Sequence, residues 1–196
     1  MIIRRHIGNA GQVWIDTLER VGSLVTGCEG ERLAAPVAAA EGKTIQDLVA
    51  LLSGMVDDAL AGTVHGVFDS TPSSGSTGKL IERLRTRAPE VADVVRSHPD
   101  GMRLVSELAT VEQDIRSALD QHAARDDDAV VLSIEYLAEV LAQHLSTAGA
   151  PGLRITCEQW GNDTAATCHE ILVADRFELF RAMNGRRSAA EVRRWM

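Results

Sequence analysis

Cysteine and aromatic residues are scarce in this chain of 196 residues. Three cysteines are too few for the disulfide framework of a small secreted domain, so we expect a reducing, cytoplasmic location. No apolar run approaches the roughly 20 residues that span a bilayer. The chain also does not open with the charged and then apolar segment of a signal peptide. We therefore expect no membrane partner.

Positive charge is also in short supply. Lys and Arg number 20 against 28 Asp and Glu, which gives a net charge of −8 and a pI near 5.2. Because nucleic-acid binding depends on excess cationic charge, nucleic acid is not an expected partner. Hydrophobic residues make up 45% of the chain, enough for a buried core in one domain, or in one domain with a small appendage.

Apolar residues recur at three- and four-residue steps through the first three quarters of the chain, a spacing typical of amphipathic helices. Thr44 followed by Asp47 has the pattern of a capping box, which starts a helix. Pro89 should kink the third helix or begin a new one. The predicted helices cover residues 12–27, 44–62, 80–95, 102–122 and 129–147.

The pattern changes from about residue 150. Residues 153–160 alternate in polarity and contain β-branched and aromatic side chains, which predicts a strand, and a turn follows at 161–163. We expect residues 166–173 to return as the second strand of a hairpin. Cys157 and Cys168 would then face each other across it, as structural rather than reactive cysteines.

Two short helices are expected to close the chain. Residues 174–184 form the first, which Gly185 ends in a left-handed conformation. Ser188 and Glu191 form a second capping box, which starts the last helix. The sequence thus predicts a mainly α fold, with a helical bundle over residues 1–148 and a small hairpin-plus-helix unit over 149–196.

Candidate functional residues are few. Glu135, Glu139 and Gln143 form one row along the helix predicted at 129–147, and His144 is adjacent to it. Such a row can line a cleft in a bundle and act as acid, base or ligand. It can equally be the solvated face of an amphipathic helix, and both interpretations stay open at this point.

Arg186 and Arg187 form a second candidate. Two adjacent guanidinium groups can clamp an anion, such as a carboxylate. However, a cation beside the negative end of the preceding helix is favourable in itself. Helix capping and this dipole effect account for every residue of the GRRS segment, so we favour the structural interpretation.

Three segments together resemble the mycothiol-dependent maleylpyruvate isomerase family of the DinB-like superfamily. They are ERLAAPVAAAEGKTIQDLVALL at 31–52, the segment 127–153 with its AGAPGLR exit, and RFELFRAMNGRRSAAEVRRW at 176–195. The resemblance covers nearly the whole chain and suits an actinobacterial source. It implies a DinB-like antiparallel four-helix bundle over residues 1–148, in which short loops make successive helices antiparallel neighbours.

The same resemblance implies a metal site, from which this chain departs. In the family, three histidines bind a divalent metal that polarises the sulfur of a low-molecular-weight thiol. Here Leu51 occupies the position of the first histidine, and the histidine of the last bundle helix falls near Gln143, one residue from His144. Leucine cannot ligate a metal, so we expect neither a metal nor another cofactor.

Two hypotheses about function therefore remain. In the first, the protein uses the cleft of the bundle to bind a small molecule or a protein partner, as a monomer or homodimer. In the alternative, it is a thiol-dependent transferase or isomerase with altered metal ligands, and only then are mycothiol or a divalent metal expected. Whether the protein is an enzyme stays open.

Overall fold

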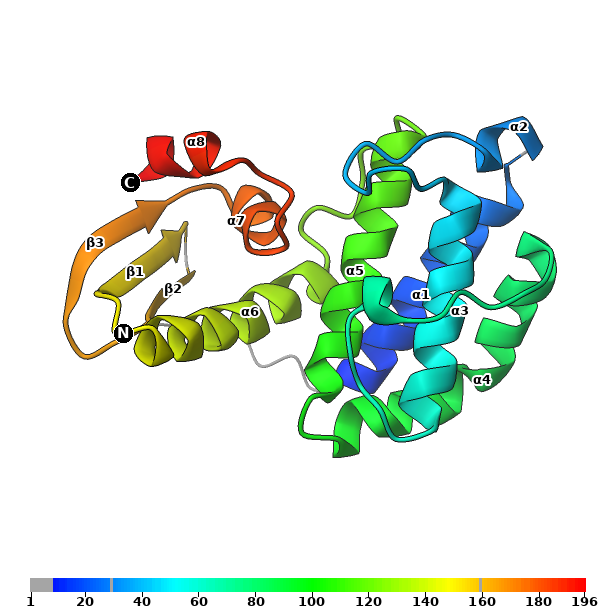
Figure 1. Cartoon of the computed structure of the whole chain (residues 1–196), viewed down its shortest axis with the longest axis horizontal. Coiled ribbons are helices and arrows are strands. Elements are labelled where there is room, and N and C mark those ends of the chain that lie inside the picture. Colours follow the sequence, from blue (N-terminus) through cyan, green and yellow to red (C-terminus); the bar gives the residue numbers. More distant parts are fainter. Residues whose placement is uncertain (1–8, 29, 159) are drawn as a thin grey trace. The chain divides into compact units, whose positions relative to one another are not determined.

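The computed structural model describes residues 9–28, 30–158 and 160–196. It is mainly helical, with one small three-stranded sheet in the C-terminal part (Figure 1), which confirms the predicted fold class. The described residues form two compact units, Asn9–Arg125 and Asp126–Met196, and each is considered by itself. No helix in the described residues is long and apolar enough to cross a membrane.

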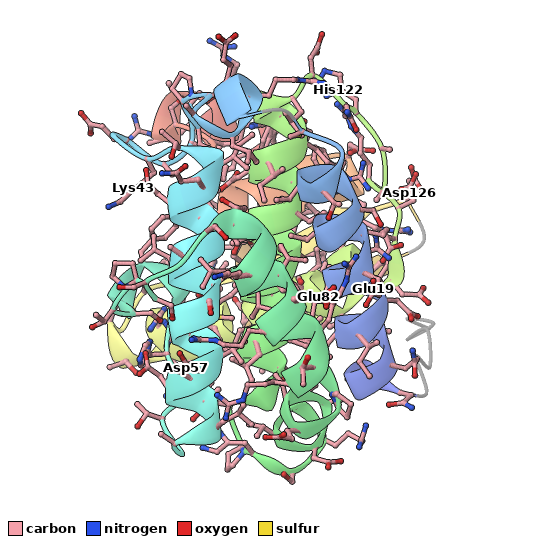
Figure 2. All side chains as sticks on the ribbon, turned by 90° about the vertical axis from the view of Figure 1, so that its right-hand side faces the viewer. Glu19, Lys43, Asp57, Glu82, His122 and Asp126 are labelled. Atoms are coloured by element: carbon pink, nitrogen blue, oxygen red, sulfur yellow. The ribbon has the colours of Figure 1, made fainter. Side chains whose placement is uncertain are left out.

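The N-terminal unit, Asn9–Arg125, is a helical bundle. Its core consists of fully buried side chains from all the long helices, including Trp14, Leu48, Leu84 and Leu108. Charged side chains such as Glu82 cover the outer faces of these helices (Figure 2). The elements are α1 (Ala10–Thr26), α2 (Gly30–Leu33), α3 (Ile45–Leu60), the 3-10 turn η1 (Val67–Asp69), α4 (Thr77–Ser97) and α5 (Gly101–Ala118).

The capping box predicted at the start of α3 is confirmed. The Asp47 amide lies 3.3 Å from the Thr44 hydroxyl, and Asp47 Oδ2 accepts a hydrogen bond from the Thr44 amide at 2.9 Å. The hydrogen bonds from Thr44 lower the pKa of Asp47 because they favour its ionised form. The helix therefore begins at the residue that its local sequence specifies.

The direction of the helices differs in part from the expectation of antiparallel neighbours. Figure 1 shows α1 and α5 running one way and α3 and α4 the other. The expectation holds for α4 and α5, which are joined by a tight turn, but α3 and α4 run parallel. Residues 61–76 make this possible because they return along α3, where the Ser73 amide donates to the Ala50 carbonyl at 2.9 Å.

A glycine lets this return segment lie against α3. A Cβ atom at Gly54 would come within 2.0 Å of the Thr71 carbonyl oxygen, so no larger residue fits without moving the segment. Farther along the chain, α4 continues through Pro89 as a single helix, and no new helix begins there. Because proline has no amide hydrogen, the Arg85 carbonyl receives no hydrogen bond from it.

The C-terminal unit, Asp126–Met196, contains one long helix and the sheet. The sequence predicted a boundary between residues 148 and 149, with this long helix in the bundle. By its contacts the helix instead groups with the sheet, and the division falls between Arg125 and Asp126. The elements are α6 (Asp128–Thr147), β1 (Gly152–Cys157), β2 (Trp160–Asp163), β3 (Cys168–Val173), α7 (Arg176–Met183), α8 (Ala189–Val192) and the 3-10 turn η2 (Arg193–Trp195).

The sheet has the strand order β2-β1-β3, so the predicted hairpin between residues 153–160 and 166–173 is wrong. The chain turns earlier, directly after β1, where Glu158 adopts a positive φ of 30°. β2 then pairs antiparallel with β1 over the residues expected to form a turn. Because β2 ends beside the start of β1, residues 164–167 can cross to the other edge of β1, where β3 pairs with it in parallel.

This topology also corrects the expected placement of the cysteines. Cys157 lies opposite Trp160 at the end of β1, whereas Cys168 lies opposite Gly152 at its start. The two thiols therefore do not face each other. Cys157 is buried, Cys28 and Cys168 are half-buried, and all three are free thiols.

Candidate functional site

The candidate residues on α6 do not all lie in the same environment: some face solvent, and one lines a cavity. Glu139 and Gln143 are exposed, and Gln143 Nε2 lies 3.4 Å from the Thr147 hydroxyl of the same helix. Glu135 is half-buried. His144 is exposed as well, but it also lines a cavity within the C-terminal unit. The solvated-face interpretation thus fits Glu139 and Gln143, whereas His144, which is adjacent to their row, lines the cavity.

This cavity, called the C-terminal cavity below, has a volume of about 420 Å³. It adjoins the small buried core formed by residues such as Ile155 and Leu179, because several of its lining residues pack against that core. Apart from His144, every described side chain that lines it is apolar, and the elements α6, β1, β3, α7 and α8 all contribute. The lining residues are Leu137, Val140, Leu141, His144, Leu153, Leu172, Ala182, Met183, Val192 and Met196.

The imidazole of His144 makes no hydrogen bond or ion pair with another residue in the part of the chain that the structure describes. Its two ring nitrogens can therefore donate to or accept from a molecule in the cavity. Among the described residues, no second ionisable side chain lies in the cavity lining. The cavity thus combines a wide apolar wall with a single polar group.

The GRRS segment has the local structure that the sequence predicts. Gly185 has a positive φ of 71° at the end of α7. Ser188 and Glu191 form the expected capping box, in which Glu191 Oε2 accepts from the Ser188 amide at 2.7 Å. Both predictions are confirmed.

The two arginines of this segment are occupied within their own unit. Arg187 forms a bidentate pair with Glu178, with Nε–Oε2 and Nη2–Oε1 distances of 2.5 and 2.8 Å. This hydrogen-bonded carboxylate raises the pKa of Arg187. Arg186 Nη1 donates to the Asn184 carbonyl at 3.0 Å. The geometry favours the structural interpretation, since an anion would have to compete with Glu178.

The sequence resemblance aligns Leu51 with the first histidine of the family's metal site. Leu51 is 5% exposed and lies in the core of the N-terminal unit, on the same helix as the buried Leu52 and Met55. No group of three or more His, Cys, Asp or Glu side chains close enough to hold a metal ion occurs among the described residues. Leucine has no donor atom, so Leu51 itself cannot ligate a metal.

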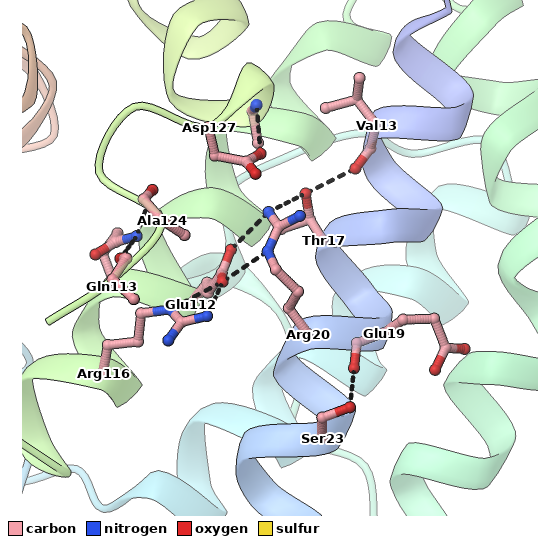
Figure 3. Close-up of polar contacts among 12 residues, drawn as sticks. Val13, Thr17, Glu19, Arg20, Ser23, Glu112, Gln113, Arg116, Ala124 and Asp127 are labelled. Atoms are coloured by element: carbon pink, nitrogen blue, oxygen red, sulfur yellow. Dashed lines mark hydrogen bonds and ion pairs between the residues drawn. The ribbon is translucent and has the colours of Figure 1, made fainter. Parts of the chain in front are cut away.

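A buried ionic cluster in the N-terminal unit was not singled out from the sequence. Glu112 of α5 is 2% exposed and accepts hydrogen bonds from Arg20 of α1 and Arg116 of α5 (Figure 3). Arg20 contacts it through Nε at 2.9 Å and Nη2 at 3.0 Å, and Arg116 through Nε at 3.0 Å and Nη2 at 2.8 Å. The spacing of Glu112 and Arg116 suggests a helical ion pair, but only the fold buries it and adds Arg20.

Beside this cluster lies a second pocket, called the α1–α5 pocket below, with a volume of about 440 Å³. It lies within the N-terminal unit, where the C-terminal halves of α1 and α5 run side by side. Its lining is mixed in character and includes both arginines of the cluster. The lining residues are Glu19, Arg20, Ser23, Leu24, Gly27, Arg116 and Gln121.

No protein-family model and no curated protein matches the sequence. Two solved structures resemble the fold. A histidine-to-alanine variant of the mycothiol-dependent maleylpyruvate isomerase matches with a TM-score of 0.51 and 15% identity, over 91% of this chain and 89% of that chain. A second structure of the mycothiol-dependent maleylpyruvate isomerase gives a TM-score of 0.46 and 16% identity, over 92% and 89% of the two chains. The first of these matches shows that the chain shares the mainly helical fold of that isomerase.

Proposed function

We propose that this protein binds a small, mainly apolar molecule with one polar group, and that the C-terminal cavity is its binding site. One observation supports this proposal, a cavity of about 420 Å³ whose described lining residues are all apolar except His144. Sites for small molecules commonly have this form, with hydrophobic walls and a few polar groups that fix the orientation of the ligand.

The physical basis of binding is the transfer of apolar surface out of water. Leu141, Leu153 and Met183 pack against the buried core but are themselves only partly buried. A ligand that covers them gains roughly 25 cal/mol for each Å² of apolar surface removed from water. Met183 and Met196 can adapt to the shape of the ligand because methionine is unbranched and flexible.

His144 determines the polar end of the expected ligand. A neutral imidazole can exchange hydrogen bonds with a hydroxyl group, and a protonated one attracts a carboxylate. Because the other lining residues are apolar, a second charged group would be buried without a partner, which is unfavourable. The expected ligand therefore carries a single hydroxyl or carboxylate on an apolar body.

A thiol-dependent transferase or isomerase is the alternative, and the fold shared with the isomerase favours it. The side chains available as metal ligands argue against the metal chemistry of that family, since Leu51 aligns with the first of the family's three histidines. We therefore propose a binding protein rather than a metal-dependent enzyme.

Titration with 2-naphthoate, monitored by calorimetry, tests the proposal. We expect saturable binding to the wild-type protein and loss of binding in Ala182→Phe, which fills the cavity from α7. Ala190→Phe introduces the same side chain at an exposed position of α8 and should bind like wild type. His144→Ala should weaken binding about tenfold, the effect of one charged hydrogen bond, and the matched variant His122→Ala should not.

Two results would contradict the proposal: no saturable binding to wild type, or undiminished binding to Ala182→Phe. The alternative function has its own measurement. If wild type and Ala182→Phe equally accelerate the addition of mycothiol to a small electrophile, the protein is a thiol-dependent enzyme whose site lies outside the C-terminal cavity.

A further inference from the structure

We propose a second ligand site: the α1–α5 pocket binds the carboxylate of a small organic acid through the open edge of the Arg116 guanidinium. This site lies in the N-terminal unit and shares no residue with the C-terminal cavity. The inference rests on the hydrogen bonds that Arg116 makes, on those it leaves unmade, and on the pocket it lines.

Arg116 is a buried cation with unused donors. The residue is only 9% exposed, yet its guanidinium bonds to a single oxygen, Glu112 Oε1, through Nε and Nη2. A guanidinium has five N–H groups, so the two hydrogens of Nη1 and the second hydrogen of Nη2 are left. These make no hydrogen bond to any residue in the described part of the chain.

Unused donors on a buried charged group are unfavourable, and in most proteins such groups have partners. Here the donors belong to a residue that lines a pocket of about 440 Å³, which is large enough for a ligand to supply the acceptors. Nη1 and Nη2 present two parallel N–H groups along the open edge. This arrangement matches the two oxygens of a planar carboxylate, which is why we infer a carboxylate ligand.

The guanidinium is also held in place before a ligand binds. Glu112 is 2% exposed and is fixed from the other side by Arg20, whose Nη2 in turn lies 3.0 Å from the Thr17 hydroxyl. Thr17 donates its own proton to the Val13 carbonyl at 2.7 Å (Figure 3). A cation fixed in this way loses little conformational freedom when it binds an anion, which favours affinity.

The rest of the pocket suits a short organic acid. The exposed Gln121 side chain makes no hydrogen bond with other described residues, so its amide can contact a second polar group of the ligand. Leu24 supplies an apolar wall. The one carboxylate in the lining, Glu19, is paired with Arg85 at 3.1 Å, which reduces its repulsion of an anion.

The experiment is a titration of the full ¹⁵N-labelled chain with succinate, followed by amide chemical shifts. We expect saturable shifts at Ser23, Gly27 and Gln121. Arg116→Lys keeps the charge but removes the planar pair of donors, and it should weaken binding at least tenfold. Arg103→Lys is the matched control, since Arg103 lies on the same helix in exposed ion pairs, and it should bind succinate like wild type.

A third variant leaves the ionic cluster intact. Ser23→Trp places a large side chain at an exposed position of the lining and should abolish the succinate shifts even if Arg116→Lys folds poorly. Sodium sulfate serves as the competing anion and should bind more weakly, since it does not match the planar edge of one guanidinium. Absent saturation, unchanged affinity in Ser23→Trp, or tighter binding of sulfate than of succinate would each overturn the proposal.

Discussion

Replacing Glu112 with glutamine tests how far the buried cluster stabilises the N-terminal unit. The substitution keeps the shape of the side chain but removes the charge that faces two guanidinium groups. It also turns one acceptor oxygen into an NH₂ group, which meets the N–H groups of Arg20 or Arg116. Two positive charges would then remain at a site where the glutamate had been 2% exposed.

The size of the effect follows from the exposure of the two partners. Removing one partner of a buried ion pair destabilises a protein by about 3–5 kcal/mol. The Arg116 side chain is 11% exposed and loses the one negative charge that pairs with it among the described residues, whereas that of Arg20, at 28%, can regain water. We therefore expect the lower end, about 3 kcal/mol, and a melting temperature lower by roughly 6–12 °C for a chain of this length.

Thermal unfolding monitored by circular dichroism at 222 nm measures this change. Glu82→Gln is the control because Glu82 is 73% exposed and lies 3.8 Å from Arg85, and an ion pair of this kind is worth less than about 1 kcal/mol. If Glu112→Gln melts at the same temperature as Glu82→Gln, the buried cluster adds no net stability, and the reasoning about Arg116 loses its structural basis.

Further predictions concern helix capping, cysteine reactivity and metal content. Ser188→Ala should lower the free energy of unfolding by about 1 kcal/mol, as loss of an N-cap does, whereas Arg187→Ala should also loosen α7 because it breaks the pair with Glu178; amide hydrogen exchange separates the two effects. Burial raises the pKa of the Cys157 thiol, so it stays protonated to higher pH than usual, and iodoacetamide at pH 8 should label Cys28 and Cys168 first. Elemental analysis of untagged protein should find well below one zinc or nickel per chain, and a stoichiometric metal would contradict the assignment of Leu51.

Local signals in the sequence were reliable where one or two residues determine the structure. The capping boxes at Thr44 and Ser188 and the left-handed Gly185 follow from backbone chemistry within four residues, so their positions could be predicted. The sheet could not, because alternation in residues 153–160 and 166–173 identifies strands without giving their partner or direction. The early turn at Glu158 decides the pairing, and no glycine marks it.

The candidate site was predictable to a similar degree. The periodicity of α6 placed Glu135, Glu139 and Gln143 in one row with His144 adjacent to it, but it could not show which of them lines a cavity formed with distant strands. The sequence predicts Arg187 as a cation near a helix end. It does not predict that Arg187 pairs with Glu178, because that contact depends on how α7 and the segment after it fold together. The side-chain geometry of a site arises from tertiary contacts, which one sequence does not specify.

The return of residues 61–76 along α3 has a consequence for the order in which the bundle assembles. Because α3 and α4 run parallel, they cannot form as a helical hairpin, and the long segment between them must close before they pack. In contrast, α4 and α5 are separated only by the turn at 98–100 and can meet as soon as they form. Since closing a short loop loses less chain entropy than closing a long one, we expect the α4–α5 hairpin to form early, with α3 joining it late in folding.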